Sequence, residues 1–184
     1  MESDIERVLL YYNTGTLHDG NRFVGGGRLG PQESYRRRAQ MLFDDLNRFL
    51  DDVERSGRRA VVVIVPEHGA NTRGDRMQIS GLREIPSPAI GLIPVGVVLA
   101  GREERPVPQE VTLPTSYLAL STLLGRFLGD NPFAQRNTNL DDYVRDLPET
   151  PFVAENEGVI IMRAADRYWM RTADGRWSEY LASR

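Results

Sequence analysis

Long apolar runs and a segment of helical periodicity alternate along the first part of the chain. The run at residues 61–65, VVVIV, has no polar alternation, and Ile5–Asn13 and Ile93–Ala100 have a similar β-branched composition. Continuous apolar runs of this length are typical of strands that are covered on both faces. The pattern therefore predicts three largely buried strands, at Ile5–Asn13, Ala60–Val65 and Ile93–Ala100.

A long helix is predicted between the first two strands. Its apolar side chains recur at alternating steps of four and three residues and so form one face, at Tyr35, Ala39, Leu42, Leu46, Phe49 and Val53. Pro31 suits the first turn of a helix, and Gly57 suits the position after its end. We therefore expect a helix from Pro31 to Ser56, with charged residues such as Arg36–Arg38 on its solvated surface.

The order of elements predicts the type of sheet. A strand, a helix and a second strand form a βαβ unit, which has parallel strands and a right-handed crossover. A second helix is predicted after the third strand, beginning at Leu113–Ser116 and ending at Gly129. The sequence thus favours an α/β fold with a mainly parallel sheet flanked by helices.

The last segment has short strands separated by tight-turn residues. Strands are predicted at Val159–Met162, Tyr168–Arg171 and Trp177–Tyr180, with Ala173–Gly175 as one of the turns. We therefore expect an antiparallel meander at the edge of the sheet. Its aromatic side chains could stack on a ligand, but such residues more often cover a neighbouring helix or pair across strands.

Composition and charge narrow the class of protein. The chain has 184 residues, enough for one domain over residues 1–184, and its 40% hydrophobic and 27% charged content is typical of a globular protein. The 23 basic residues, all arginine, are scattered and the net charge is −3, so no nucleic-acid partner is expected. The absence of cysteine excludes disulfides, thiolate nucleophiles and zinc ribbons within this chain. No signal peptide or membrane span is predicted.

The candidate chemistry lies where the second strand ends. Pro66 has no N–H to donate, so Glu67 and His68 follow at the end of the sheet, where open α/β folds bind ligands. Neighbouring side chains of a strand point to opposite faces, so these two could hold one ion only if the chain turns. Gly69 permits that turn. A second histidine, His18, lies on the loop after the first strand, and the two loops could meet.

The types of these side chains suit a metal ion. Carboxylate and imidazole groups are donors for zinc, which takes four ligands, or three and a substrate oxygen. Two donors do not complete such a site, and the other interpretation of Glu67 and His68 is a capped turn with a surface histidine. Residues 25–27 are not part of a phosphate-binding P-loop, because no Lys-Ser or Lys-Thr pair follows them.

Several segments of the chain resemble a known family. The BcsG family has segments similar, nearly residue for residue, to YYNTGTLHDGNRF, VVVIVPEHGANTRGDRMQISGLREIPSP and IPVGV, and the similarity continues through LPTSYLAL. Members of this family are metal-dependent phosphoethanolamine transferases that modify bacterial cellulose, within the alkaline phosphatase and sulfatase superfamily. The resemblance implies an alkaline-phosphatase-like fold, of which this chain would be the carboxyl-terminal part of the catalytic domain.

The resemblance also implies an activity and a location. The activity is the zinc-dependent transfer of phosphoethanolamine from phosphatidylethanolamine to the hydroxyls of cellulose. The location is the periplasm, in a protein anchored in the inner membrane, and the cellulose synthase complex is an implied partner. Carried onto this chain, the family pattern makes Glu67 and His68 zinc ligands. It places His18 beside the transferring phosphoryl group as general acid or base, and it makes Arg83 a contact for the phosphoryl oxygens. The other interpretation of Arg83 is a surface charge.

One part of the family pattern is absent from this sequence. The resemblance covers the later half of the catalytic domain, whereas the family's serine nucleophile and a cysteine ligand come from the earlier half. Thr72 and Ser80 are hydroxyls on the loop after His68, but nothing marks either as activated. Two further hypotheses therefore stand beside the enzyme. One is a non-catalytic module that binds a phospholipid or glucan or associates with cellulose synthase, and the other is a separately encoded half that pairs with another chain.

Overall fold

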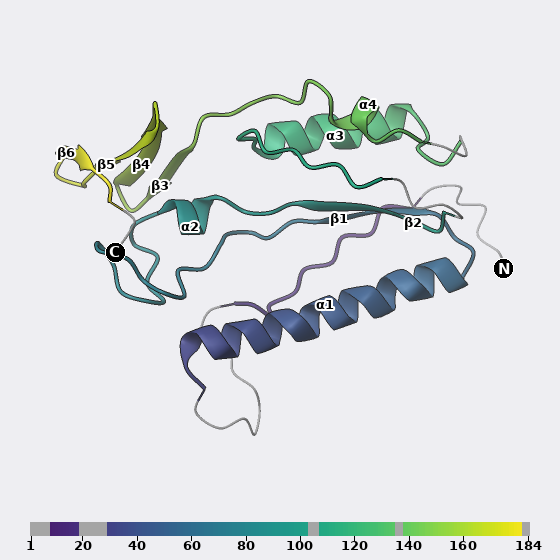
Figure 1. Ribbon diagram of the computed structural model, residues 1–184, viewed down its shortest axis with the longest axis horizontal. Coiled ribbons are helices and arrows are strands. Elements are labelled where there is room, and N and C mark those ends of the chain that lie inside the picture. The colour runs from purple at the N-terminus through teal and green to yellow at the C-terminus, as the bar shows by residue number, and fades with distance from the viewer. Residues whose placement is uncertain (1–7, 19–28, 103–106, 135–137, 182–184) are drawn as a thin grey trace.

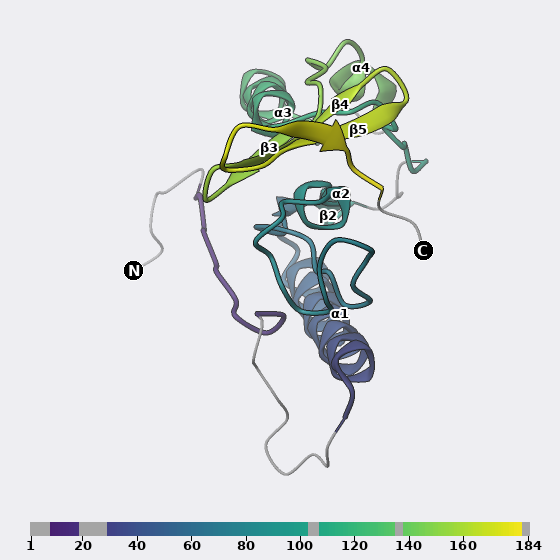
Figure 2. The ribbon, with the colours of Figure 1, turned by 90° about the vertical axis from the view of Figure 1, so that its left-hand side faces the viewer.

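The computed structural model describes residues 8–18, 29–102, 107–134 and 138–181 of the chain. In chain order its elements are α1 (Pro31–Arg55), β1 (Ala60–Ile64), α2 (Pro88–Gly91), β2 (Gly96–Ala100), α3 (Tyr117–Gly129), α4 (Asp141–Val144), β3 (Val153–Asn156), β4 (Val159–Ala164), β5 (Arg167–Arg171) and β6 (Trp177–Glu179). Both ribbon views place α1 on one side of β1 and β2, with α3 and α4 on the other (Figures 1 and 2). The strands β3 to β6 form a separate sheet beyond one end of β1 and β2 (Figure 1). The described residues thus form an α/β fold with two sheets.

The strands β1 and β2 pair antiparallel, with Ala60 opposite Ala100 and Ile64 opposite Gly96. The predicted parallel sheet is therefore not seen between these two strands, and the predicted βαβ unit would need the first strand, Ile5–Asn13, as the partner of β1. Residues 8–13 of the predicted first strand form no regular strand, and residues 5–7 lie outside the described part of the chain. An apolar run predicts an extended, buried segment, but it does not specify the neighbouring strand. Here the chain leaves β1, passes through α2 and returns beside β1 as β2.

The helix α1 agrees with its prediction to within one residue, with Pro31 in the first turn and Gly57, at a φ of 68°, just after the end. The predicted solvated surface is wrong for Arg38, which is only 9% exposed. Its Nη1 donates to the backbone oxygens of Thr16 (2.8 Å) and His18 (3.0 Å). Through this buried side chain, α1 holds the segment that carries His18.

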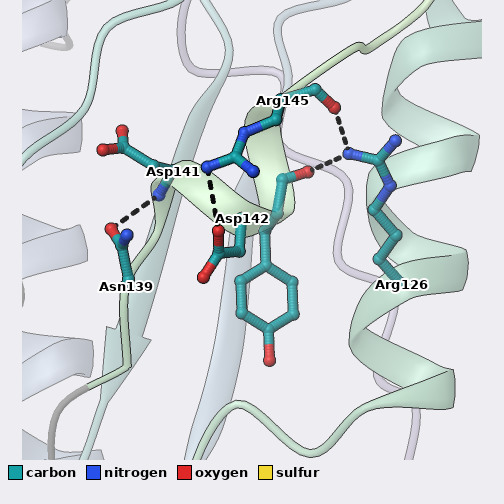
Figure 3. Close-up of polar contacts among 6 residues, drawn as sticks. Arg126, Asn139, Asp141, Asp142 and Arg145 are labelled. Carbon is teal, nitrogen blue, oxygen red and sulfur yellow. Dashed lines mark hydrogen bonds and ion pairs between the residues drawn. The ribbon is translucent and has the colours of Figure 1, made fainter.

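The helix α3 begins and ends as predicted, because Ser116 caps its first turn and Gly129 is its last residue. Arg126 on α3 holds the short helix α4, since its Nη1 donates to the backbone oxygens of Tyr143 (2.7 Å) and Arg145 (2.5 Å) (Figure 3). These carbonyls lie at the end of α4, where they lack partners within the helix. None of the helices in the described ranges is long and apolar enough to cross a membrane.

The strands β3 to β6 form an antiparallel meander, with β3 added to the three predicted strands. The meander is confirmed, but its predicted place at the edge of the main sheet is wrong, because among the described residues its strands pair only with one another. Its core consists of Phe152, Ile161, Met170 and Tyr180. Tyr168 meets Phe152 edge-on, with ring centroids 5.6 Å apart, which indicates a structural role for its ring. The meander core packs against Ile85, on the loop after β1. The meander thus contacts the rest of the fold through side-chain packing and not through strand pairing with β2.

Candidate functional site

The candidate site begins just after β1, where the chain bends at Glu67 and His68 before Gly69. The N–H of Gly69 donates to the backbone oxygen of Ile90 at 2.7 Å. A Cβ on Gly69 would lie 2.1 Å from the backbone oxygen of Ala89, so no larger residue fits here without a backbone shift. The glycine is therefore required by the close approach of α2 to the turn. Glu67 is exposed at this turn, and His68 is partly buried.

The imidazole of His68 has a partner at each nitrogen. Its Nε2 lies 2.7 Å from Nη1 of Arg83, and its Nδ1 lies 2.7 Å from the backbone oxygen of Gly69. A guanidinium can only donate, so Nε2 accepts, and Nδ1 therefore carries the proton and donates to the carbonyl. Metal-binding histidines commonly have one N–H held by a carbonyl, as Nδ1 is here, but the lone pair of Nε2 is used by Arg83 in this structure, so a metal would bind there in place of that hydrogen bond.

Arg83 comes from the loop between β1 and α2, and its backbone is held from a distant part of the chain. Asn156, on β3, donates through Nδ2 to the backbone oxygens of Arg83 (3.1 Å) and Glu84 (3.4 Å). The guanidinium of Arg83 lies beside the nitrogen of His68 that would bind a metal. The structure thus brings together two residues that the sequence analysis assigned to different roles, a metal ligand and a phosphate contact.

His18 is placed by a different set of contacts. Its backbone oxygen accepts from Arg38 on α1, its N–H donates to the oxygen of Gly15 at 3.0 Å, and the residue is exposed. The contacts that position His18 therefore run to α1, whereas those of His68 run to Arg83 and the turn at Gly69. The general acid or base role of His18 stays a prediction.

The donor set for a metal is incomplete in this part of the protein. Within the ranges that the structure describes, no group of three or more histidine, cysteine, aspartate or glutamate side chains could hold a metal ion. The orientation of His68 fits a ligand, and Glu67 adjoins it, but a four-coordinate zinc site needs further donors. The hydroxyl of Ser80 donates to the backbone oxygen of Thr72 at 2.8 Å, so it stabilises the loop.

A pocket of about 250 Å³ adjoins this turn. It is lined by residues 70–75, residues 87–89 and Tyr180. Asn71 is 7% exposed, and its Nδ2 has no hydrogen-bond partner among the described residues. The loop after β1, the start of α2 and Tyr180 of the meander therefore form this pocket together.

Sequence reasoning missed the residues that attach this loop to the meander. The hydroxyl of Tyr180 donates to Oδ2 of Asp75 at 2.6 Å, across 105 positions of sequence. Oδ1 of Asp75 accepts from the backbone N–H groups of Met77 (2.6 Å) and Gln78 (2.9 Å). An aspartate in a turn-rich loop is a recognised signal for such local capping. No comparable signal points to Tyr180 or Asn156, because both contacts depend on how the meander packs.

Comparison with known proteins places the chain in a family. Residues 1–177 match the family described as the Cellulose biosynthesis protein BcsG C-terminal domain. The chain belongs to the BcsG family. This confirms the family and the carboxyl-terminal part that the sequence resemblance indicated.

Two curated relatives of this family are both named Cellulose biosynthesis protein BcsG. The relative from Escherichia coli K12 is 40% identical over 176 residues, and the relative from Salmonella typhimurium LT2 is 39% identical over 176 residues. Each match covers 95% of this chain and 31% of the relative. The chain thus spans about a third of the length of these BcsG relatives.

Proposed function

We propose that this chain is the carboxyl-terminal part of a zinc-dependent transferase that acts in cellulose biosynthesis. The reaction moves phosphoethanolamine from phosphatidylethanolamine to the hydroxyls of cellulose. The observation that carries the proposal is the contact at the end of β1 between the neutral imidazole of His68, oriented by the carbonyl of Gly69, and the guanidinium of Arg83, which would leave Nε2 to a metal when it contacts a phosphoryl group instead. A metal ligand beside a fixed cation suits phosphoryl transfer, where charge on the phosphoryl oxygens must be stabilised.

Each candidate residue has a role that its chemistry supports. Glu67 and His68 would hold the zinc ion, which when bound polarises the phosphoryl group and activates a hydroxyl. Arg83 offers a planar fork of N–H donors that matches phosphoryl oxygens. His18 carries an imidazole, which can both donate and accept a proton, and it would transfer a proton to or from an oxygen of the reacting group.

The remaining ligands and the nucleophile would come from another part of the polypeptide. Two donors bind zinc weakly, and the chain spans 31% of the length of its relatives. The proposed protein works in the periplasm, anchored in the inner membrane, next to the cellulose synthase complex. We refer below to the complete transferase, meaning this chain joined to the segment that supplies the other ligands, from its own gene or from the Escherichia coli relative.

The exposed segment at residues 8–12 supports a larger fold in the complete transferase. Its five apolar side chains, Val8, Leu9, Leu10, Tyr11 and Tyr12, are 76–97% exposed. Covering a large aliphatic side chain contributes roughly 1.5–3 kcal/mol, so leaving this segment in water is unfavourable. We propose that residues 8–12 become a strand of an alkaline-phosphatase-like, mainly parallel sheet that the other segment completes.

Hydrogen exchange tests this proposed strand. In the complete transferase the amides of residues 8–13 should exchange at least 100-fold more slowly than in the isolated chain, because ladder hydrogen bonds protect them. The amides of β4, paired on both sides by β3 and β5, serve as the reference that is protected in both proteins. Equally fast exchange of residues 8–13 in both proteins would contradict the strand.

A Glu67→Ala variant of the complete transferase tests the enzymatic proposal. The unchanged protein should bind about one zinc per chain and release phosphoethanolamine from a phosphatidylethanolamine analogue in a zinc-dependent manner. Glu67→Ala should lower both the bound zinc and the release rate by about 100-fold, since a ligand is lost. Glu84→Ala, which removes an exposed carboxylate from the same loop, should change neither. A folded complete protein with neither zinc nor activity would favour the non-catalytic module instead.

A further inference from the structure

The C-terminal meander is attached to the loop that carries Arg83, which we call the Arg83 loop and define as residues 70–87. The two are far apart in sequence, and the meander has no hydrogen-bonded ladder with β1 or β2. Three separate contacts nevertheless join them, at Tyr180, at Asn156 and at Ile85. Two of these contacts are hydrogen bonds, so the meander holds the Arg83 loop in place as well as covering an apolar side chain.

The first contact is the hydrogen bond from the hydroxyl of Tyr180 to Oδ2 of Asp75, at 2.6 Å. Tyr180 is 3% exposed and belongs to the meander core, and its N–H donates to the oxygen of Tyr168 at 2.8 Å. Its ring therefore has little freedom to move. Burial and the adjacent Asp75 carboxylate raise the pKa of Tyr180 above its usual value, so the hydroxyl stays protonated and keeps donating.

Asp75 connects Tyr180 to the rest of the Arg83 loop through further hydrogen bonds. Its Oδ1 accepts from the N–H groups of Met77 and Gln78, and its own N–H donates to the oxygen of Gln78 at 2.9 Å. The side chain of Gln78 then pairs with the backbone of Ile85 in both directions, Nε2 to oxygen at 2.8 Å and N–H to Oε1 at 3.2 Å. The network thus ends two residues from Arg83.

The other two contacts hold the same end of the loop. Nδ2 of Asn156 donates to the backbone oxygens of Arg83 and Glu84, at 3.1 and 3.4 Å. The side chain of Ile85 packs against the meander core. The backbone at Arg83 and at the two residues after it is therefore held by the meander, while the guanidinium of Arg83 reaches Nε2 of His68 at 2.7 Å.

We propose that Tyr180 and Asn156 are positioning residues, which fix the backbone of Arg83 and so keep its guanidinium beside His68. This inference rests on the proposed function above. A long arginine side chain ends at a defined point only if its backbone is fixed, and a displacement of about 1 Å at a reacting group can lower a rate by about 100-fold. The meander supplies that fixed support from outside the site.

Kinetics of the complete transferase test the proposal through Tyr180→Phe and Asn156→Ala. Each variant should lower kcat for release from the phosphatidylethanolamine analogue by about tenfold, with zinc content unchanged. In an Arg83→Gln background the same two changes should lower kcat less than twofold, since there is no guanidinium left to position. Tyr168→Phe is the matched control, because it removes a hydroxyl from a ring that packs against the same core, and it should keep the normal kcat. Equal losses with and without Arg83 would overturn the proposal.

A spectroscopic measurement separates this inference from the proposed function. In the zinc-free complete protein, nitrogen chemical shifts of His68 should show the Nδ1–H tautomer that Arg83 enforces. Tyr180→Phe and Asn156→Ala should shift His68 toward a mixture of tautomers, and Tyr168→Phe should not. This result supports the positioning role even if no transferase activity is found. An unchanged tautomer in both folded variants would overturn the positioning role even if the enzyme is active.

Discussion

Replacing His68 with alanine is expected to abolish zinc binding and to lower the transfer rate of the complete transferase by about 1,000-fold. Loss of a bound metal removes several kcal/mol of transition-state stabilisation, and each 1.4 kcal/mol is about tenfold in rate. The variant also removes the acceptor for Arg83, whose Nη1 lies 2.7 Å from Nε2 of His68. Zinc content by elemental analysis and the release of phosphoethanolamine measure the two effects separately.

His68→Gln distinguishes the two roles of this imidazole. A glutamine side chain can still offer an oxygen to Arg83, but an amide is a poor zinc ligand compared with imidazole. We therefore expect His68→Gln to lose zinc and activity as His68→Ala does. Full activity in a zinc-free His68→Gln protein would contradict the ligand role and would leave only the contact with Arg83.

Replacing Gly69 with alanine is expected to have the largest effect on stability, lowering the free energy of unfolding by about 2–3 kcal/mol. The added Cβ would lie 2.1 Å from the backbone oxygen of Ala89 and 3.0 Å from its carbonyl carbon. Neither is the end of a flexible side chain, so α2 or the turn must move. Such a movement strains the hydrogen bond from Gly69 N–H to the oxygen of Ile90 and shifts the adjacent His68.

Gly125→Ala is the matched control for this substitution. Gly125 lies within α3, and a Cβ there would meet nothing within 4 Å. The change should stabilise the protein by about 0.5–1 kcal/mol, because alanine loses less backbone entropy in a helix. Urea unfolding followed by circular dichroism measures both variants. A Gly69→Ala protein as stable as the unchanged one would show that the approach of α2 to the turn is not needed.

The local features of the fold were predictable because their causes are local. The periodic apolar positions, Pro31 and Gly57 place α1, and Ser116 and Gly129 place α3. The meander follows from short strands and turn residues. The sheet type was not predictable in this way, because residues 8–13 extend without a partner in the described structure, and β1 pairs with the returning strand β2.

By itself, the sequence determined the helices α1 and α3, the meander and the family, and it supplied Glu67, His68, Arg83 and His18 as candidates for the site. Motif, periodicity and turn chemistry are properties of neighbouring residues, so one sequence can reveal them. Only the tertiary structure decided that Arg83 meets His68, that Arg38 is buried against the His18 segment, and that Tyr180 and Asn156 support the Arg83 loop. These contacts join residues 15 to 105 positions apart. They depend on how separate elements pack, which no local pattern records.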